Sequence, residues 1–432
     1  MSQQFQLPRG TQDTLPAQWR LRFRVFDIAR QRFENAGFGR ISTPTFEHTE
    51  LFHRGVGTGT DIVGKETYTF EDRGGRSLTL RPEGTAGVSR AFVAQGMHRE
   101  PLPVKLWYAA AMFRYEKPQA GRLREHNQLG CEVLGSESPA VDAEVIAVQA
   151  GIYRDLELPD LKLLINSVGS PDARASYREA LVTYLTPLRD QLDPDSQERL
   201  ETNPLRILDT KHPETRALLT DAPRLPEFLT DEDRAHFARL CTLLDAIGIE
   251  YEVDPLLVRG LDYYSRTVWE FSSSALGAQS TIGAGGRYDG LIEQLGGPAT
   301  PGVGFGTGIE RIVLCLEAMG AQSSSRTADA YIGVHPDAGD AAWTRAVQIV
   351  TALRERHRPV ELDLAGRSAK GQAKQASRLD AALRVFVDDL GARMFLRGDF
   401  DGVDLPADVD AAIGQIDAQL VIAEQIRAGA DS

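Results

Sequence analysis

The stretch FRYEKPQAGRLREHNQLGCE, from Phe113 to Glu132, says most about the architecture of this chain. Its pattern predicts a strand, a basic loop and a second strand. Successive side chains of a strand point to opposite faces, so the alternate residues of each strand share a face. These residues are Arg114 and Glu116 on the first strand, and Gln128, Gly130 and Glu132 on the second. Buried charges are costly without partners, so the pattern favours a cleft that binds a charged, zwitterionic ligand.

The loop between the two strands is basic. It carries Lys117, Arg122 and Arg124, and such side chains suit phosphate or nucleic acid. An exposed hairpin with a solvated charged face would have the same pattern. The motifs that follow decide between the two interpretations.

Composition limits the class of protein. A chain of 432 residues, 42% apolar and 25% charged, is typical of a globular protein with two or three domains. It has no apolar run long enough for a membrane span, and the start MSQQFQLPRGTQDTLP lacks a secretory pattern. Cys131, Cys241 and Cys315 have no zinc-binding spacing. We expect a cytoplasmic protein with reduced thiols. The net charge of −13 argues against nonspecific coating of nucleic acid but allows a local basic patch.

The order of patterns along the chain predicts its organisation. A helix is expected from about Trp19 to Ala36, and the runs TYTF and SLTL around Gly74 and Gly75 predict a hairpin. The region from about 170 to 253 is mostly helical and charged, like an insertion. QSSSRT, at 322–327, is a linker candidate, and strands and helices alternate after it, which predicts a small α/β domain.

Two further motifs support a cleft. In LVRGLDYYSRTVWEF, Arg259 stands at a turn and can project into a cleft, and Tyr264 is expected on a buried strand. Alternatively, Arg259 pairs with Asp262 or another acid at the surface. In GVGFGTGIERIVL, glycines alternate along a strand, which indicates close approach of a ligand or another backbone, or tight helix packing. Arg311, in the first turn of the next helix, is placed for a phosphate.

These motifs, together with RGTQDTLP, TPTFEHTELF, TLRPEGTAG, NPLRILDTKHPE and GAGGRYDGL, resemble the bacterial-type histidyl-tRNA synthetases of class II. The resemblance covers essentially the whole chain. It implies an α+β fold: an antiparallel sheet flanked by helices in a catalytic domain of residues 1–325, with the helical insertion at about 170–253. It also implies an anticodon-binding α/β domain at 328–432, and a homodimer whose interface includes the Pro44 region.

The resemblance also implies roles for individual residues. The expected histidine site is Glu83, Thr85, Arg114, Gln128, Glu132, Arg259, Tyr263 and Tyr264. The expected ATP site is Arg114, Glu116, Arg122, His126, Gly304, Gly306 and Arg311. Residues expected to contact tRNA are Gln119, Arg122, Arg124, Lys370 and Lys374. Arg259 and Arg114 would be catalytic, ATP would be a substrate that carries Mg²⁺, and no residues are assigned to a metal.

The chain departs from the family pattern beside the ATP site. His126 stands where an aromatic residue usually stacks on adenine, and Asn127 follows it where histidine is common. Two alternative functions stay open on the sequence: a noncatalytic regulatory paralogue of ATP phosphoribosyltransferase, and a class II synthetase for another amino acid. The motif RGLDYY argues against the latter.

Overall fold

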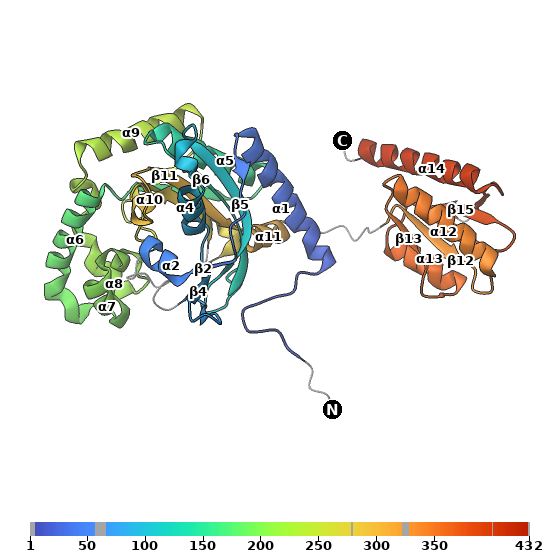
Figure 1. The fold of residues 1–432 in the computed structure, drawn as a ribbon, viewed down its shortest axis with the longest axis horizontal. Helices are drawn as coiled ribbons and strands as arrows, with labels where there is room; N and C mark the ends of the chain where they lie inside the picture. Colours follow the sequence, from blue (N-terminus) through green and yellow to red (C-terminus); the bar gives the residue numbers. More distant parts are fainter. Residues whose placement is uncertain (1–4, 57–65, 278–279, 322–327, 400, 431–432) are drawn as a thin grey trace. The chain divides into compact units, whose positions relative to one another are not determined.

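The computed structural model describes residues 5–56, 66–277, 280–321, 328–399 and 401–430. The chain forms two compact units, Met1–Gln322 and Ser323–Ser432. The linker predicted at 322–327 lies outside the described residues. Figure 1 shows a large sheet flanked by helices in the first unit and a smaller sheet with its own helices in the second.

The first unit is built on an eight-stranded sheet in the order β1-β5-β6-β11-β10-β9-β7-β8. Neighbouring strands are antiparallel except for the edge pairs β1–β5 and β7–β8. This confirms the predicted antiparallel sheet. In sheet order the strands are β1 (Gly39–Arg40), β5 (Val104–Phe113), β6 (Glu125–Leu134), β11 (Gly302–Gly308), β10 (Thr281–Arg287), β9 (Ser265–Ser273), β7 (Leu161–Ser167) and β8 (Glu252–Val253).

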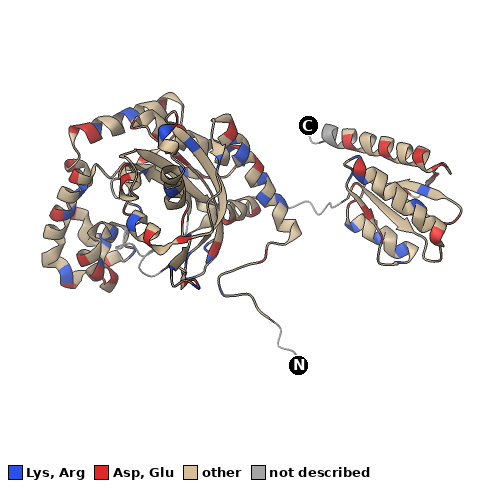
Figure 2. Cartoon of the chain, viewed as in Figure 1, with Lys and Arg blue, Asp and Glu red and all other residues tan. Residues whose placement is uncertain are grey.

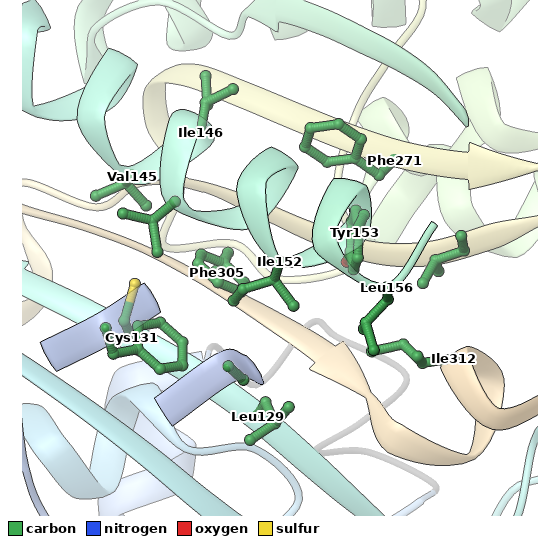
Figure 3. Close-up of a cluster of buried hydrophobic side chains, with 14 of the residues drawn as sticks. Leu129, Cys131, Val145, Ile146, Ile152, Tyr153, Leu156, Phe271, Phe305 and Ile312 are labelled. Carbon is green, nitrogen blue, oxygen red and sulfur yellow. The ribbon is translucent and has the colours of Figure 1, made fainter. Parts of the chain in front are cut away.

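One face of this sheet carries the main hydrophobic core. Leu129 and Cys131 of β6 and Phe305 of β11 pack there against the covering helices (Figure 3). These helices are α1 (Pro16–Asn35), α5 (Pro139–Asp155) and α11 (Ile309–Ala318). Alternation along the strands sends Gln128, Glu132 and the glycines of β11 to the opposite face.

The opposite face is partly covered by short elements. A second cluster there includes Tyr108, Phe92 and Tyr288. The elements are α2 (Thr49–Val56), α4 (Thr85–Ala94), η1 (Met97–Arg99), α10 (Leu291–Gln294) and a small antiparallel sheet of β2 (Phe46–His48), β4 (Ser77–Leu80) and β3 (Thr69–Glu71). Strands β3 and β4 are the hairpin predicted around Gly74 and Gly75.

The predicted helical region is helical in the structure and has its own core. Its elements are α6 (Pro171–Leu185), η2 (Thr186–Gln191), α7 (Pro194–Thr202), η3 (Pro204–Asp209), α8 (Pro213–Leu218), η4 (Leu219–Asp221), η5 (Leu225–Glu227) and α9 (Asp231–Ala246), while η6 (Ser274–Leu276) follows β9. Serine, aspartate and threonine side chains cap α6, α7 and α9. Helix α9 packs on α5, and its Leu240 and Leu244 join the main core.

The second unit has the predicted alternation of strands and helices. Its sheet has the order β13-β12-β14-β15-β16, with the first three strands parallel. Along the chain the elements are β12 (Ala330–Val334), α12 (Asp340–Glu355), β13 (Val360–Leu362), α13 (Ala369–Arg378), β14 (Leu383–Val387), β15 (Ala392–Leu396), β16 (Val403–Asp404) and α14 (Val409–Ala430). None of the helices in the described ranges has the length and hydropathy of a membrane span.

Two strand ends differ from the sequence prediction. Strand β5 ends at Phe113, so Arg114 and Glu116 follow the strand instead of lying on it. The Arg114 N–H still bonds the Arg124 carbonyl opposite it, but the backbone then leaves the ladder, because the Tyr115 N–H bonds the Glu66 carbonyl. The Arg114 guanidinium bonds the Pro82 carbonyl. Tyr264 likewise precedes β9, because the Arg174 guanidinium binds the carbonyls of Asp262 and Tyr264 and holds this segment as a turn.

Candidate active site

A cavity of about 1050 Å³ lies on the sheet face opposite the main core. It brings together every residue predicted for the histidine and ATP sites except Glu132. Those lining it are Glu83, Thr85, Arg114, Glu116, Arg122, His126, Gln128, Arg259, Tyr263, Tyr264, Gly304, Gly306 and Arg311. The structure therefore has the predicted cleft, and the alternative of an exposed hairpin with a solvated charged face is wrong.

Glu132 lies just beneath the cavity lining and is 1% exposed. Its carboxyl accepts hydrogen bonds from Thr85 Oγ1 at 2.7 Å, from Tyr108 OH at 3.3 Å and from Tyr288 OH. Burial raises its pKa to about 8 in spite of these donors. The site thus holds a carboxyl that takes up or releases a proton near neutral pH.

The glycines of β11 make room for protein side chains. A Cβ on Gly304 would lie 1.9 Å from Glu132 Oε2, and one on Gly306 would lie 2.4 Å from Gln128 Nε2. The sequence indicated that a ligand or another part of the chain lies close to these glycines. In the structure, the polar side chains of β6 lie there. Tight helix packing is not the reason for these two glycines.

Tyr108 was missed in the sequence. Its ring fills the space beside two glycines, because a Cβ on Gly84 or Gly130 would lie 2.3–2.4 Å from its ring carbon Cζ. Its hydroxyl accepts from Gln128 Nε2 at 3.0 Å and donates to Glu132. Tyr288, also missed, lies in the motif GGRYDGL, so the sequence carried a signal for it.

Glu83 faces the start of α4. Its carboxylate accepts the backbone N–H groups of Thr85 and Ala86 at 2.7 and 2.8 Å. Burial raises the pKa of Glu83, while these bonds and the charge of Arg114 act in the opposite direction. Burial also lowers the pKa of Arg114. The two side chains place opposite charges on neighbouring parts of the cavity lining.

The other end of the cavity is cationic. Arg122 forms an ion pair with Glu116, and Arg311 donates from Nε to the Thr281 carbonyl. His126 lies near Arg114 and Arg122, and burial together with these charges lowers its pKa to about 3. The imidazole is therefore neutral at physiological pH and presents a flat, uncharged ring.

Arg259 pairs inside the cavity with Glu270, and the distance from its Nη1 to Glu270 Oε2 is 2.5 Å. The alternative partner Asp262 was wrong, since Asp262 instead accepts from Asn203 Nδ2 at 2.7 Å. Within the part of the chain that the structure describes, Arg259 Nε is buried and has no hydrogen-bond partner. One donor of the guanidinium is thus left unsatisfied by the protein.

A buried network supports the cationic end. Arg22 of α1 forms an ion pair with Glu310 at 2.9 Å, and Glu310 accepts from both the backbone and the side chain of Asn127. Because Asn127 follows His126 and Glu310 precedes Arg311, the network joins β6 and α11 next to two cavity residues.

The residues predicted to contact tRNA lie outside the cavity, apart from Arg122. Gln119 and Arg122 form a backbone bridge, and the Arg124 guanidinium lies 3.7 Å from the centre of the exposed Tyr115 ring. Lys370 and Lys374 are exposed on α13 of the second unit. Figure 2 shows basic and acidic positions interspersed along the helices of both units.

The antiparallel sheet, its covering helices and the polar cavity define a class II aminoacyl-tRNA synthetase. The family model described as histidyl-tRNA synthetase matches residues 10–312, and the chain belongs to this family. The chain is 48% identical to the histidine-tRNA ligase of Thermosynechococcus vestitus, over 89% of each chain. It is 47% identical to that of Streptococcus sanguinis, over 87% of this chain and 88% of the relative.

A solved structure agrees. The apo histidyl-tRNA synthetase of Staphylococcus aureus superposes with a TM-score of 0.78 at 36% identity, over 95% of this chain and 99% of that one. A Bacillus halodurans protein described as an ATP phosphoribosyltransferase regulatory subunit/histidyl-tRNA synthetase shares the fold at 22% identity, with a TM-score of 0.65 over 89% and 99% of the two chains.

Proposed function

We propose that this chain is a histidine-tRNA ligase that works in two steps. It activates L-histidine with ATP to histidyl-adenylate and pyrophosphate, and then transfers histidine to the 3′ end of tRNA(His). The relatives at 47–48% identity carry this name, which favours the enzyme over the regulatory paralogue. The observation that carries the proposal is one cavity that combines buried carboxyls, Glu83 in its lining and Glu132 just beneath it, with the arginines Arg114, Arg259 and Arg311.

Histidine would bind beside the carboxyl groups of Glu83 and Glu132. Glu83, Thr85 and Gln128 would hold its α-amino group, since an ammonium needs acceptors and a negative charge. Glu132 and Tyr264 would bind the imidazole, and Tyr263 would shape the pocket. An amino acid without the imidazole N–H would leave Glu132 without that donor, and buried polar groups left unpaired give strong discrimination.

The first step is attack by the histidine carboxylate on the α-phosphorus of ATP, with pyrophosphate as the leaving group. Arg259 and Arg114 would stabilise the charge that develops at the α-phosphate, and Arg311 would bind the distal phosphates. Arg259 lines the cavity and has a donor that the protein leaves unsatisfied, which supports this role. Because the substrate supplies the nucleophile, catalysis depends on positioning and on cationic donors.

The adenosine would lie along β11 at Gly304 and Gly306. The neutral imidazole of His126 would stack on adenine, where a charged ring would add repulsion to the neighbouring arginines. Glu116 and Arg122, ion-paired with each other, complete this end of the site.

Mg²⁺ would enter with the phosphates of ATP and neutralise part of their charge. Glu116 and Glu270 are carboxylates of the cationic end, and each already pairs with an arginine. Among the described residues, no group of three or more His, Cys, Asp or Glu side chains could hold a metal ion. The donor set therefore fits a metal held mainly by ATP.

The second step needs tRNA at the mouth of the cavity. Gln119, Arg122 and Arg124 would contact the acceptor end, and Lys370 and Lys374 would contact the anticodon part from the second unit. Gln119 and the two arginines lie in the loop after β5. The two lysines are four residues apart on α13, a spacing that places both on one helix face. We also propose that the protein is a cytoplasmic homodimer whose interface includes the Pro44 region.

Exchange of radiolabelled pyrophosphate into ATP tests the proposal. We expect exchange with histidine, none with a panel of other amino acids, and loss of exchange in Arg259→Ala. A folded wild-type protein that binds histidine without exchange would overturn the synthetase assignment.

A further inference from the structure

Glu270 is a carboxylate of the cavity to which neither the sequence motifs nor the proposed mechanism gives a role. It lies on β9, on the face opposite Trp269 and Phe271, which pack in the main core. The strand register aligns it with Ala284 of β10 and, beyond that, with Gly306 of β11. Glu270 therefore belongs to the same cross-strand row as a residue of the proposed adenosine site.

The two carboxylate oxygens of Glu270 have different partners. Oε2 lies 2.5 Å from Arg259 Nη1, and Oε1 accepts from Thr281 Oγ1 at 2.6 Å. The carbonyl of Thr281 in turn accepts from Arg311 Nε. A continuous set of hydrogen bonds thus joins Arg259, Glu270, Thr281 and Arg311.

The arrangement leaves one donor of Arg259 unsatisfied. Glu270 accepts from Nη1 of Arg259, while Nε of the same guanidinium is buried and has no partner among the described residues. A long arginine side chain loses its rotamer freedom when one end of its guanidinium is held, so less entropy is lost when a ligand binds the rest. The carboxylate also places a negative charge near the arginines of this end.

We propose that Glu270 is a positioning residue for adenylate formation, which holds Arg259 directly and Arg311 through Thr281. This inference rests on the proposed function. Glu270 acts through the arginines and touches neither histidine nor ATP. Its loss therefore lowers the rate of the chemical step without weakening the binding of ATP, because a negative charge near the phosphates is removed.

The experiment compares Glu270→Gln with the wild type in pyrophosphate exchange and in single-turnover formation of histidyl-adenylate. We expect kcat to fall roughly 100-fold, the typical result of misplacing a catalytic group by about 1 Å. KM for ATP stays level or falls. In an Arg259→Ala background, Glu270→Gln adds less than about threefold, because coupled residues are not additive.

A second pair of variants covers the case in which Glu270→Gln does not fold. Thr281→Val removes the hydroxyl that holds Oε1 and should lower kcat about tenfold, a loss on the scale of one hydrogen bond. Thr281→Ser should restore it. Glu252→Gln, which removes the carboxylate of an exposed Lys162–Glu252 pair on the same sheet, is the matched control and leaves kcat unchanged.

Three results would overturn the positioning role. The first is a kcat within twofold of the wild type for both Glu270→Gln and Thr281→Val. The second is a fall in kcat for Glu270→Gln that multiplies with the fall caused by Arg259→Ala. The third is a kcat of Glu270→Gln that higher Mg²⁺ restores, which would make Glu270 a metal ligand. A wild type without histidine-dependent exchange would instead overturn the proposed function. Calorimetric titration with histidine would then still test whether Glu270→Gln weakens the site as Arg259→Ala does.

Discussion

The cavity of the first unit and helix α13 of the second carry charge in different ways. In the cavity, Glu83 accepts two backbone N–H groups and Arg259 pairs with Glu270, and Glu132 just beneath the lining accepts from three hydroxyl groups. On α13, Lys370 and Lys374 are exposed to solvent. Burial makes each polar group of the cavity depend on its partners, whereas exposed charges depend on water and salt. Single substitutions should therefore have large effects in the cavity and small ones on α13.

The largest effect is expected where a buried charge loses its partner. Arg22→Met leaves Glu310 buried and should lower the free energy of unfolding by about 3–5 kcal/mol, measured by urea unfolding followed by fluorescence. Arg24→Met, on the same helix, removes an exposed pair with Glu157 and should cost below about 1 kcal/mol. Equal effects of the two variants would erase the contrast between buried and exposed charges.

A smaller loss is expected from one added methyl group. Gly304→Ala places a Cβ against Glu132 Oε2 and the Cys131 carbonyl, so it must displace the Glu132 carboxyl, which we propose binds the imidazole. Histidine-dependent exchange should fall roughly 100-fold, as for a group moved by about 1 Å.

The matched control lies in the second unit. A Cβ on Gly414 of α14 meets nothing within 4 Å, so Gly414→Ala should stabilise that helix by about 0.5–1 kcal/mol and leave exchange unchanged. Exchange in Gly304→Ala at the wild-type rate would show that the cavity tolerates the shift.

The titration of Glu132 gives a third test. Its pKa is raised to about 8 in the folded protein, so its contribution to stability is full below its unfolded pKa and is lost as pH rises to about 8. Glu132→Gln does not titrate, and its unfolding free energy relative to wild type should rise by up to about 1.4 kcal/mol per pH unit between about pH 5 and 8. A level difference across this range would contradict the raised pKa.

The smallest effect per residue is expected on α13. Replacing Lys370 and Lys374 by alanine should raise KM for tRNA about tenfold at low salt, lower the salt slope by about one per lysine and leave pyrophosphate exchange unchanged. Arg356→Ala, at the end of α12, is the surface control. If the lysine variants charge tRNA like the wild type at every salt concentration, α13 is a solvated helix face.

The fold was predictable where local patterns were strong. Period-2 alternation and the glycine motif identified β6 and β11, and alternating strands and helices identified the second unit. The prediction was wrong at the ends of two strands, where Arg114 and Arg174 bind backbone carbonyls distant in sequence. No local pattern announces such a bond.

The site was predictable in part for the same reason. The resemblance named residues that line one cavity, while Tyr108, Glu270 and Thr281 were missed. The Tyr108 ring fits only because Gly84 and Gly130 have no side chain. The carboxylate of Glu270 bonds Arg259 and Thr281, which lie on two other segments. These roles depend on register between strands, which a single sequence does not specify for distant partners.

The turn before β9 has a consequence for engineering. Arg174 of α6 holds the carbonyls of Asp262 and Tyr264, and Asn203 holds the Asp262 side chain. The helical region at about 170–253, which the sequence marks as an insertion, therefore holds the segment that carries Arg259 in place. A shortened protein that keeps the sheet but lacks these two side chains would keep Arg259 and lose the contacts that fix the segment carrying it.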